Sequence, residues 1–288
     1  NVDFEGIPTS QRDNFTRFVR RLHDSLSMNY SDFGLTLAGP AVDWNGSWDF
    51  PALSAIVDFI VLMGYDYHWQ SGETAGPVAP LSGDYVNVRY SIGDYIASGC
   101  PRDKILLGVP WYGYDWPVET DTRNAKTIGS GKTARYFQAK QMANQYGKAF
   151  DTVSQSVVIK YISGDTLHQL WFDDSLSLSK KYREAIDSSL GGIAIWAIGY
   201  EADCREMWQA IDCALGSETI AEDAIASAET QIFPIPARDF LRIDTRGRDI
   251  KSVEINDMLG KRVFTIMNCN RSELFVKTAG WTSGVYFL

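Results

Sequence analysis

Two acidic side chains stand two residues apart at the start of the sequence, in Asn1-Val2-Asp3-Phe4-Glu5. In a β-strand, positions i and i+2 point to the same face, so Asp3 and Glu5 would lie side by side while Val2 and Phe4 face a core. Two carboxyl groups this close repel each other as anions, which favours a retained proton on one of them. A protonated carboxyl group is what a general acid requires. The alternative interpretation is a strand end that carries two solvated acids.

Three further segments bring polar or aromatic side chains to the ends of apolar runs. Residues 58–63, 104–109 and 191–195 are nearly continuous apolar runs, which are typical of strands buried on both faces. Parallel strands end at one edge of a sheet, where α/β enzymes carry their chemistry. The side chains expected to meet Asp3 and Glu5 there belong to Met63-Gly64-Tyr65-Asp66, Gly108-Val109-Pro110-Trp111-Tyr112-Gly113 and Trp196.

Each of these residues also has a purely structural interpretation. Tyr65 and Asp66 could begin a loop, and Trp196 could pack in the core as a Trp in an apolar strand usually does. Trp111 and Tyr112 could pack at the rim of the sheet. The 9 Trp, 14 Tyr and 14 Phe suit both a core and a sugar-binding cleft lined by flat rings, so their number alone does not decide.

The elements that position these side chains alternate between strands and helices. This alternation of apolar strands with helices predicts a parallel α/β sheet. An α+β insertion is expected at 114–170, with a helix near 133–146 and alternating segments at 153–161 and 167–171. The predicted parallel strands lie at 1–5, 33–39, 58–64, 104–109 and 191–197, and the predicted helices at 10–28, 49–54, 84–98, 175–189 and 201–214.

The sequence pattern changes after residue 215. Residues 216–228 are small, acidic and poor in aromatics, which indicates a linker. Residues 229–288 contain short alternating segments, with a turn at Leu259-Gly260-Lys261, and predict a small all-β sandwich domain. The expected strands there are at 240–243, 252–255, 262–264 and 285–288.

The overall charge and composition exclude several functions. The formal net charge of −9 argues against nucleic acid or an anionic membrane as the main partner. Only three His residues and no C-x-x-C pattern occur, so no metal centre is expected. The sequence shows no membrane span or signal peptide, and because it starts directly on a strand motif, its natural N-terminus is expected to lie upstream.

Four strand-end motifs, in this order, resemble glycoside hydrolase family 18, the chitinase-like enzymes. Asn1-Val2-Asp3-Phe4-Glu5 resembles the tail of the family signature D-x-x-D-x-D-x-E. The other matches are M-x-Y-D at 63–66, G-x-P-x-Y-G at 108–113, the Trp of the last strand at Trp196, and a segment around Trp171-Phe172-Asp173-Asp174. The resemblance covers residues 1–215 and implies strands four to eight of a (β/α)8 barrel, so that three strands would lie upstream. The alternative is an intact domain with an open five-stranded sheet.

The resemblance also implies a mechanism in which the substrate's own N-acetyl group is the nucleophile. Glu5 would be the acid and base, Asp3 would bind the acetamide N–H, and Tyr65 would bind the acetamide oxygen. No cofactor is implied, and the implied partner is a polysaccharide that contains N-acetylglucosamine. The implied substrate-binding residues are Asp66, Met63, Tyr112, Trp111 and Trp196, whose ring would form the floor beneath the sugar.

Asn1 departs from the family pattern, because the family has an aspartate there. Asn1, with Phe4 before Glu5, resembles the branch related to spore-cortex and peptidoglycan hydrolases. The implied substrate is therefore chitin, a chito-oligosaccharide or the peptidoglycan glycan. A catalytically silent, lectin-like protein on the same fold is the alternative, although such relatives usually lack the acid that Glu5 provides.

The C-terminal segment resembles the sorting domain of cargo of the Bacteroidota type IX secretion machinery. The matching parts are 233–241, 253–263 and 283–287, with Ile235 in place of the usual Asn between two prolines. The resemblance implies that the protein is secreted or held at the cell surface. A generic sandwich module, such as a carbohydrate-binding one, is the alternative, although the segment has a single Trp, Trp281.

Overall fold

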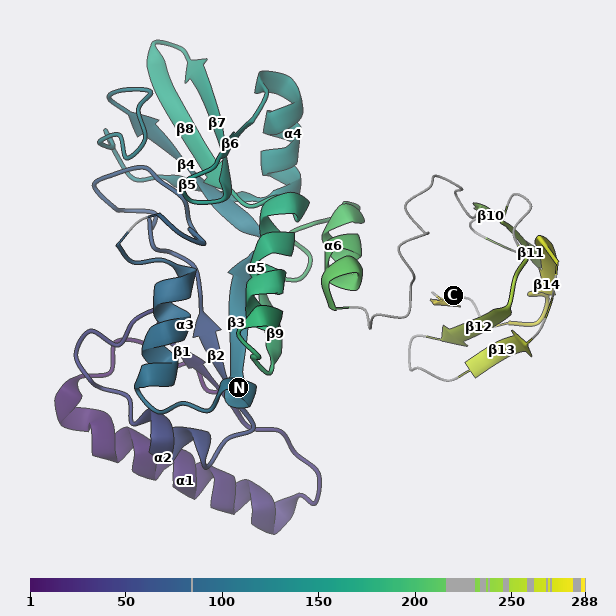
Figure 1. Cartoon of the computed structure of the whole chain (residues 1–288), viewed down its shortest axis with the longest axis horizontal. Helices are drawn as coiled ribbons and strands as arrows, with labels where there is room; N and C mark the ends of the chain where they lie inside the picture. Colours follow the sequence, from purple (N-terminus) through teal and green to yellow (C-terminus); the bar gives the residue numbers. More distant parts are fainter. Residues whose placement is uncertain are drawn as a thin grey trace. The chain divides into compact units, whose positions relative to one another are not determined.

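The computed structural model describes residues 1–83, 85–215, 231–233, 237, 239–245, 249–257, 262–267, 269, 271–281 and 286–287. The chain divides into two compact units, Asn1–Gly216 and Ser217–Leu288, which are taken one at a time (Figure 1). The predicted linker at 216–228 lies outside the described residues. Within the described part of the chain, no helix has the length and apolar character needed to cross a membrane.

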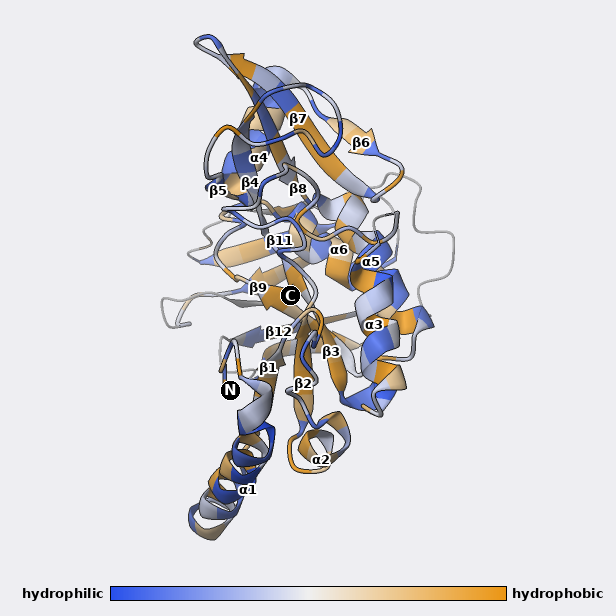
Figure 2. Ribbon diagram, turned by 90° about the vertical axis from the view of Figure 1, so that its left-hand side faces the viewer, coloured by the Kyte–Doolittle hydropathy of each residue, from blue (hydrophilic) through white to orange (hydrophobic). Residues whose placement is uncertain are grey.

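A parallel sheet of four strands forms the centre of the first unit. Its strands are β1 (Thr36–Gly39), β2 (Phe59–Met63), β3 (Ile105–Pro110) and β9 (Gly192–Trp196), in the order β1-β2-β3-β9. All three pairings are parallel, and the strands appear largely hydrophobic in Figure 2. The predicted strands at 33–39, 58–64, 104–109 and 191–197 are therefore confirmed. The side chains without exposed surface include Leu37, Ile60, Leu62, Ile105, Leu107 and Val109.

The prediction of a full strand at 1–5 is wrong. Val2 alone pairs with the sheet, through a parallel bridge to Leu37 in which the Val2 N–H donates to the Thr36 carbonyl at 2.8 Å. Phe4 turns toward the first long helix and stacks on Phe18 at 5.4 Å between ring centroids. Gly6 then takes a φ of 65°, a left-handed conformation that ends the extended segment. The segment lies beside β1 as expected, but its pairing stops where Phe4 packs on the helix.

Helices pack around this sheet at the positions that the sequence predicts. Three of them begin at a side chain that accepts a backbone N–H bond, namely Asp49, Asn87 and Asp174. Two begin four or more residues later than predicted, at Val88 and Glu206. The helices are α1 (Arg12–Asn29), α2 (Phe50–Ser54), α3 (Val88–Ala97), α5 (Ser175–Asp187) and α6 (Glu206–Leu215), with 3-10 turns η1 (Thr9–Gln11) and η2 (Arg102–Lys104).

The chain between β3 and β9 forms a second, antiparallel sheet (Figure 1). It has five strands in the order β5-β4-β8-β7-β6, and α4 (Tyr136–Tyr146) packs on β4, β7 and β8. The helix and strands expected at 114–170 are present, and the sheet begins earlier, at Tyr112. Its strands are β4 (Tyr112–Val118), β5 (Lys132–Arg135), β6 (Ala149–Asp151), β7 (Ser156–Ser163) and β8 (Thr166–Phe172).

A buried ion pair joins the end of this inserted sheet to the helix beside the parallel sheet. Lys181 on α5 donates to Asp173, which follows β8, at 2.7 Å, and the two side chains are 0% and 1% exposed. Burial raises the pKa of Asp173, and the Lys181 cation acts in the opposite direction. Since α5 also contacts β3 and β9, the pair ties the two sheets together.

In the part of the second unit that the structure describes, the strands form two small antiparallel sheets of three strands each. Their shared core consists of apolar side chains such as Ile243, Val253 and Val276, which fits the predicted sandwich. The predicted turn at 259–261 and residues 283–285 lie outside the described residues. The first sheet has β10 (Gln231–Phe233), β11 (Phe240–Asp244) and β14 (Glu273–Lys277), and the second has β12 (Ser252–Asp257), β13 (Arg262–Met267) and β15 (Tyr286–Phe287).

Candidate active site

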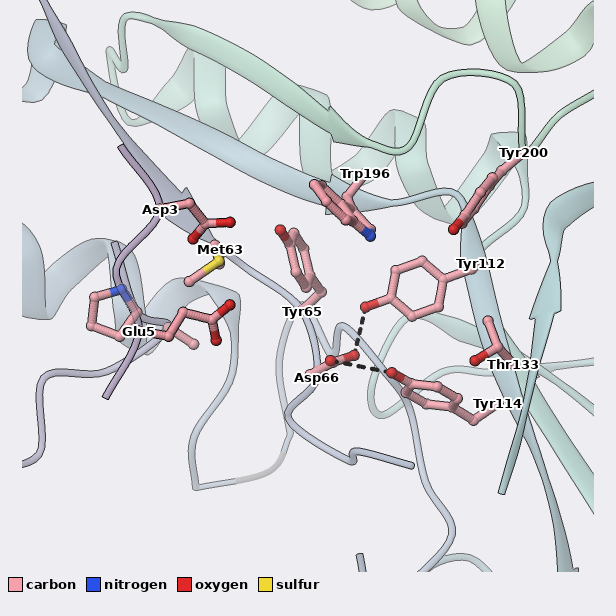
Figure 3. Close-up of a pocket in the computed structure, with 12 residues that line it drawn as sticks. Asp3, Glu5, Met63, Tyr65, Asp66, Tyr112, Tyr114, Thr133, Trp196 and Tyr200 are labelled. Atoms are coloured by element: carbon pink, nitrogen blue, oxygen red, sulfur yellow. Dashed lines mark hydrogen bonds between the residues drawn. The ribbon is translucent and has the colours of Figure 1, made fainter. Parts of the chain in front are cut away.

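A cavity of about 410 Å³ opens at the carboxyl ends of the parallel strands (Figure 3). It forms there because β2, β3 and β9 run in the same direction and end at one edge. Of the site residues predicted from the sequence, all but Trp111 line this cavity. They are Asp3, Glu5, Met63, Tyr65, Asp66, Tyr112 and Trp196.

The two carboxyl groups enter the cavity from the extended segment beside β1. Asp3 and Glu5 both line the cavity and are exposed, while Phe4 between them packs on Phe15 and Phe18 of α1. This is the alternation expected of an extended chain. The Asn1 side chain donates to the hydroxyl of Thr36 at 2.8 Å, which fixes the start of the segment on β1.

Asp66 is held by two tyrosines from the inserted sheet. The Tyr112 hydroxyl donates to Oδ1 at 2.6 Å, and the Tyr114 hydroxyl donates to Oδ2 at 3.2 Å. Burial raises the pKa of Asp66, and these two hydrogen bonds lower it. The residue has a φ of 59°, a left-handed conformation that Asp tolerates better than most residues and that turns its side chain away from the line of β2. Its carboxylate therefore occupies a fixed position in the cavity wall.

Tyr65 presents a hydroxyl that stays protonated. Burial raises its pKa, and the nearby acids Asp66, Asp3 and Glu5 raise it further, so the group remains a hydrogen-bond donor. Its ring packs edge-on against Tyr112, with 6.1 Å between centroids. The neighbouring strand β3 has a glycine here, Gly108. A Cβ at this position would lie 2.7 Å from the Leu62 carbonyl oxygen, which is too close. The close approach of β2 and β3 thus sets the position of the Tyr65 ring.

Trp196, the last residue of β9, also lines the cavity. The residue is 52% exposed. The Trp196–Ala197 peptide bond is cis. The Trp196 carbonyl accepts a hydrogen bond from the Trp111 N–H at 2.8 Å, so β9 remains tied to β3 up to this residue. A flat apolar ring of this kind suits contact with the apolar face of a sugar.

Trp111 does not lie at the cavity. It is fully buried, its ring packs edge-on against Trp208 at 5.0 Å, and its Nε1 donates to the Tyr182 hydroxyl at 3.4 Å. Successive residues of an extended chain point to opposite sides, so Tyr112 faces the cavity and Trp111 faces the helices. The placement of Trp111 among the substrate-binding residues is therefore corrected: it packs in the core.

The sequence analysis missed several residues of the cavity wall. Tyr114 had a detectable signal, since Tyr112, Tyr114 and Trp116 alternate along one face of β4. Thr133 from β5 and Tyr200 after β9 had none, because only the tertiary fold brings them to the cavity. The Arg135 guanidinium lies over the Tyr200 ring at 5.2 Å from its centroid, and so positions that ring.

The charged residues that line the cavity are all acidic, namely Asp3, Glu5 and Asp66. The described residues contain no group of three or more His, Cys, Asp or Glu side chains arranged to hold a metal ion. The arrangement offers the carboxyl groups of Asp3 and Glu5, the Tyr65 hydroxyl donor and the aromatic ring of Trp196. These groups can transfer a proton and stabilise a positive charge on a bound sugar.

The second unit matches a known family over residues 231–288, described as the secretion system C-terminal sorting domain. This match confirms the resemblance seen in the sequence. It indicates that the protein is secreted or held at the cell surface.

The first unit matches the family described as glycosyl hydrolases family 18, over residues 1–201. A relative in Bacillus subtilis strain 168, whose name describes a sporulation-specific glycosylase, is 31% identical and covers 68% of this chain and 46% of its own length. A cortical fragment-lytic enzyme of Bacillus anthracis is 28% identical and covers 69% of this chain and 46% of its own length. The chain thus spans about half the length of these curated relatives.

A solved structure supports the same relationship. The crystal structure of a chitinase from Chromobacterium violaceum has a TM-score of 0.64 and 26% identity, covering 75% of this chain and 65% of that one. This likeness confirms the expected barrel-type α/β fold. With the family match extending over every cavity residue described above, the chain belongs to family 18 of the glycosyl hydrolases.

Proposed function

We propose that this protein hydrolyses β-1,4 glycosidic bonds in N-acetylglucosamine polymers, namely chitin, chito-oligosaccharides or the peptidoglycan glycan. The observation that carries the proposal is the meeting of Glu5, Asp3 and Tyr65 in one cavity, beside the exposed ring of Trp196. The likeness to a chitinase and to a cortical fragment-lytic enzyme supports this class of substrate.

In the first step, the sugar that is attacked lies over Trp196. Glu5 donates its proton to the glycosidic oxygen while the bond from that oxygen to the anomeric carbon breaks. The carbonyl oxygen of the sugar's own acetamide forms a new bond to the anomeric carbon and gives a cyclic oxazolinium ion. Asp3 accepts a hydrogen bond from the acetamide N–H and stabilises the positive charge.

In the second step, Glu5 is a carboxylate and takes a proton from water as the water oxygen attacks the anomeric carbon. The bond to the acetamide oxygen breaks, the acetamide is restored, and Glu5 has regained its proton. Two displacements at one carbon retain its configuration. This route needs no second enzyme carboxylate as a nucleophile.

Tyr65 and Asp66 position the substrate in this scheme. The Tyr65 hydroxyl donates to the acetamide oxygen and holds it in line with the anomeric carbon. Asp66 accepts hydrogen bonds from hydroxyl groups of the same sugar. Its own orientation is set by Tyr112 at 2.6 Å, so the inserted sheet contributes to binding through this carboxylate.

The proposal is tested by Glu5→Gln in the full chain, with chito-oligosaccharides as substrate. Loss of the acid is expected to lower kcat by about 10²–10⁴-fold, the usual contribution of general acid catalysis. The matched control is Glu73→Gln, which changes an exposed acid outside the cavity and should leave kcat unaltered. Undiminished hydrolysis by Glu5→Gln would refute the assignment. Oligosaccharide binding without turnover by the unaltered protein would instead favour the lectin-like alternative.

We also propose that residues 231–288 direct the chain to a type IX secretion machinery, as in the Bacteroidota. The family match over this segment supports the proposal. Its test is deletion of residues 229–288, followed by measurement of the protein in the medium and at the surface of a Bacteroidota host. Export should be lost while binding to polysaccharide is kept. Retained export with lost binding would show a carbohydrate-binding module instead.

A further inference from the structure

A separate cavity of about 280 Å³ is lined by residues of α3, α5 and the turn that joins β6 to β7. It shares no lining residue with the catalytic cavity. In Figure 2, α3 and α5 lie on one side of the parallel sheet, and the start of the chain lies on the other. This space is called the cationic cavity below, because its charged lining residues are Arg89, Lys180, Arg183, Glu184 and Asp187.

We infer that the cationic cavity binds a carboxylate group on a peptide stem of peptidoglycan, and so holds the enzyme on that polymer at a point away from the reacting sugar. The inference rests on the proposed function and narrows its substrate class to a glycan that carries peptides. Chitin and chito-oligosaccharides carry no anionic group that such a cavity could bind.

Two of the cations on α5 are available to a ligand. Lys180 and Arg183 are three residues apart on the helix, so they lie on one side of it, and both are exposed. Among the described residues, neither forms an ion pair with an acid. The Lys180 ammonium lies over the Phe150 ring, 6.0 Å from its centroid, a contact that leaves its charge uncompensated.

Arg89 adds a third cation, from α3. Its Nε donates to the Glu184 carboxylate at 2.7 Å, which fixes the guanidinium group in the cavity wall. The Arg89 side chain is still 55% exposed, so its other N–H groups can donate to a bound oxyanion. Because Glu184 already accepts this bond, the acid that remains to oppose an anion is Asp187.

The acids in the wall limit the charge of the group that fits. The described lining residues have a formal excess of one positive charge. A carboxylate carries one negative charge, whereas a phosphate monoester carries nearly two at neutral pH and would meet stronger repulsion from Asp187. The lining therefore matches a carboxylate better than a phosphate.

The remaining wall of the cavity is held in place without a ligand. The Leu81 N–H donates to the Ser154 carbonyl at 2.9 Å, and the Ser82 hydroxyl donates to the Val153 carbonyl at 3.0 Å. These bonds tie the segment before α3 to the β6–β7 turn. A ligand therefore meets cations carried on two helices and a wall that needs little ordering.

The charge of the rest of the protein gives such a site a purpose. The chain has a formal net charge of −9, and the charged residues of the catalytic cavity are all acidic. An anionic wall polymer is therefore repelled by the protein as a whole. A cationic cavity on the outer helices offsets this repulsion locally and keeps the carboxylates of the polymer away from Asp3 and Glu5.

The first test measures binding of a peptide stem, released from peptidoglycan, to the full-length protein by calorimetry. One form of the peptide has free carboxylates, and in the other these are converted to methylamides. The Kd of the free acid should be about tenfold lower, the order of two or three partly exposed ion pairs, and added salt should reduce the difference. Equal Kd values would overturn the inference, as would displacement of the peptide by an equal concentration of inorganic phosphate.

Two double variants locate the binding. Lys180→Gln with Arg183→Gln should raise the Kd of the free acid about tenfold and leave that of the methylamide unchanged. Arg20→Gln with Arg21→Gln is the matched control, because it removes the same charge from exposed positions on α1 that line neither cavity. All four positions are exposed, so both proteins should keep their melting temperature. An equal loss of binding in the two would show a general effect of net charge and overturn the inference.

Hydrolysis then links the cavity to the substrate. With glycan strands that carry peptides, Lys180→Gln with Arg183→Gln should raise KM about tenfold and keep kcat, because the lost contact does not change during the reaction. With chitotetraose, neither constant should change. An unchanged KM for the peptide-bearing strands would overturn the role of the cavity in substrate binding.

These measurements separate the inference from the proposed function. If the unaltered protein cleaves neither the peptide-bearing strands nor chitotetraose, the proposed function is wrong. The peptide titrations need no turnover, so they still decide whether the cavity binds a carboxylate. Preference for the free acid that is lost in Lys180→Gln with Arg183→Gln supports the site, and the same preference in both double variants overturns it.

Discussion

The two sheets of the first unit contribute to the cavity in different ways. The parallel sheet contributes through strand ends, where the chain leaves regular structure and side chains can converge. The inserted antiparallel sheet contributes from residues within its strands β4 and β5, where side chains alternate between the two faces. The first group comprises Asp3, Glu5, Met63, Tyr65, Asp66 and Trp196, and the second comprises Tyr112, Tyr114 and Thr133.

This difference means that the strand ends supply the reacting groups, whereas the antiparallel sheet supplies groups that orient them. The strand ends carry the acidic groups and allow an unusual backbone, such as the φ of 59° at Asp66. The antiparallel face carries neutral hydroxyl groups, two of which hold that same carboxylate. Changes at the strand ends should therefore remove rate, whereas changes on the antiparallel face should shift affinity and pH dependence.

The largest effect is expected where the two sheets are joined. Lys181→Met leaves the Asp173 carboxyl group buried without its cation, which should lower the free energy of unfolding by about 3–5 kcal/mol. Urea denaturation followed by tryptophan fluorescence measures this change. Lys180→Met, at the adjacent exposed position, is the control and should cost less than about 1 kcal/mol. Similar losses for both variants would show that the buried pair does not stabilise the junction.

Asp3→Asn tests the charge at the parallel edge. The amide has the same shape but does not stabilise the positive charge on the oxazolinium ion, so kcat should fall about 10²–10³-fold. Asp13→Asn changes an exposed acid on α1 and should leave kcat as it is. A higher KM with an unchanged kcat would contradict the role given to Asp3, because the charge develops after the substrate has bound.

Tyr65→Phe tests the hydroxyl donor at the same edge. Without it, the acetamide oxygen is no longer held in line, and kcat should fall about 10–10²-fold. Tyr67→Phe is the matched control, since its hydroxyl bonds Ser91 at 2.7 Å and does not line the cavity. It should reduce stability without a change in kcat. Equal kcat values for Tyr65→Phe and Tyr67→Phe would show that the Tyr65 hydroxyl has no role in the reaction.

Tyr112→Phe and Tyr114→Phe test the antiparallel face. Each removes a hydrogen bond that lowers the pKa of Asp66, so that pKa rises in both variants. Because the ionised carboxylate is the form that accepts substrate hydroxyls, the acidic limb of the pH profile of kcat/KM should move to higher pH. The shift should be larger for Tyr112, whose bond is 2.6 Å, than for Tyr114 at 3.2 Å. A shift to lower pH would contradict this assignment.

The sequence predicted the parallel sheet well because its strands are marked by composition. β1 and β3 are buried along most of their length and are almost entirely apolar, so they stand out without knowledge of their neighbours. β2 and β9 are also apolar, although β2 is fully buried only at alternate residues and β9 is only partly buried. The segment at 1–5 carries the same alternation as a strand, yet pairs only at Val2, because the packing of Phe4 on Phe18 draws the chain away. That outcome depends on a helix contact that the local pattern does not contain.

Site residues could be predicted from the sequence where they directly follow a strand. They could not be predicted where only the tertiary fold brings them to the cavity. Tyr65, Asp66 and Trp196 directly follow apolar runs. Tyr200 follows β9 by several residues, and its position depends on Arg135 from another element. Trp111 was placed at the cavity because it adjoins Tyr112, although alternation of side chains sends the two in opposite directions.

The left-handed backbone of Asp66 limits how this enzyme can diversify. Most residues pay roughly 1–2 kcal/mol for this conformation, whereas Asp, Asn and Gly adopt it more readily. Glu would keep the charge but pay that strain and move the carboxylate away from Tyr112, and Asn would keep the backbone but lose the charge. Neither of these single replacements keeps both the backbone conformation and the negative charge. Adaptation to new glycans should therefore proceed through Tyr114, which has no such backbone constraint, while position 66 stays fixed.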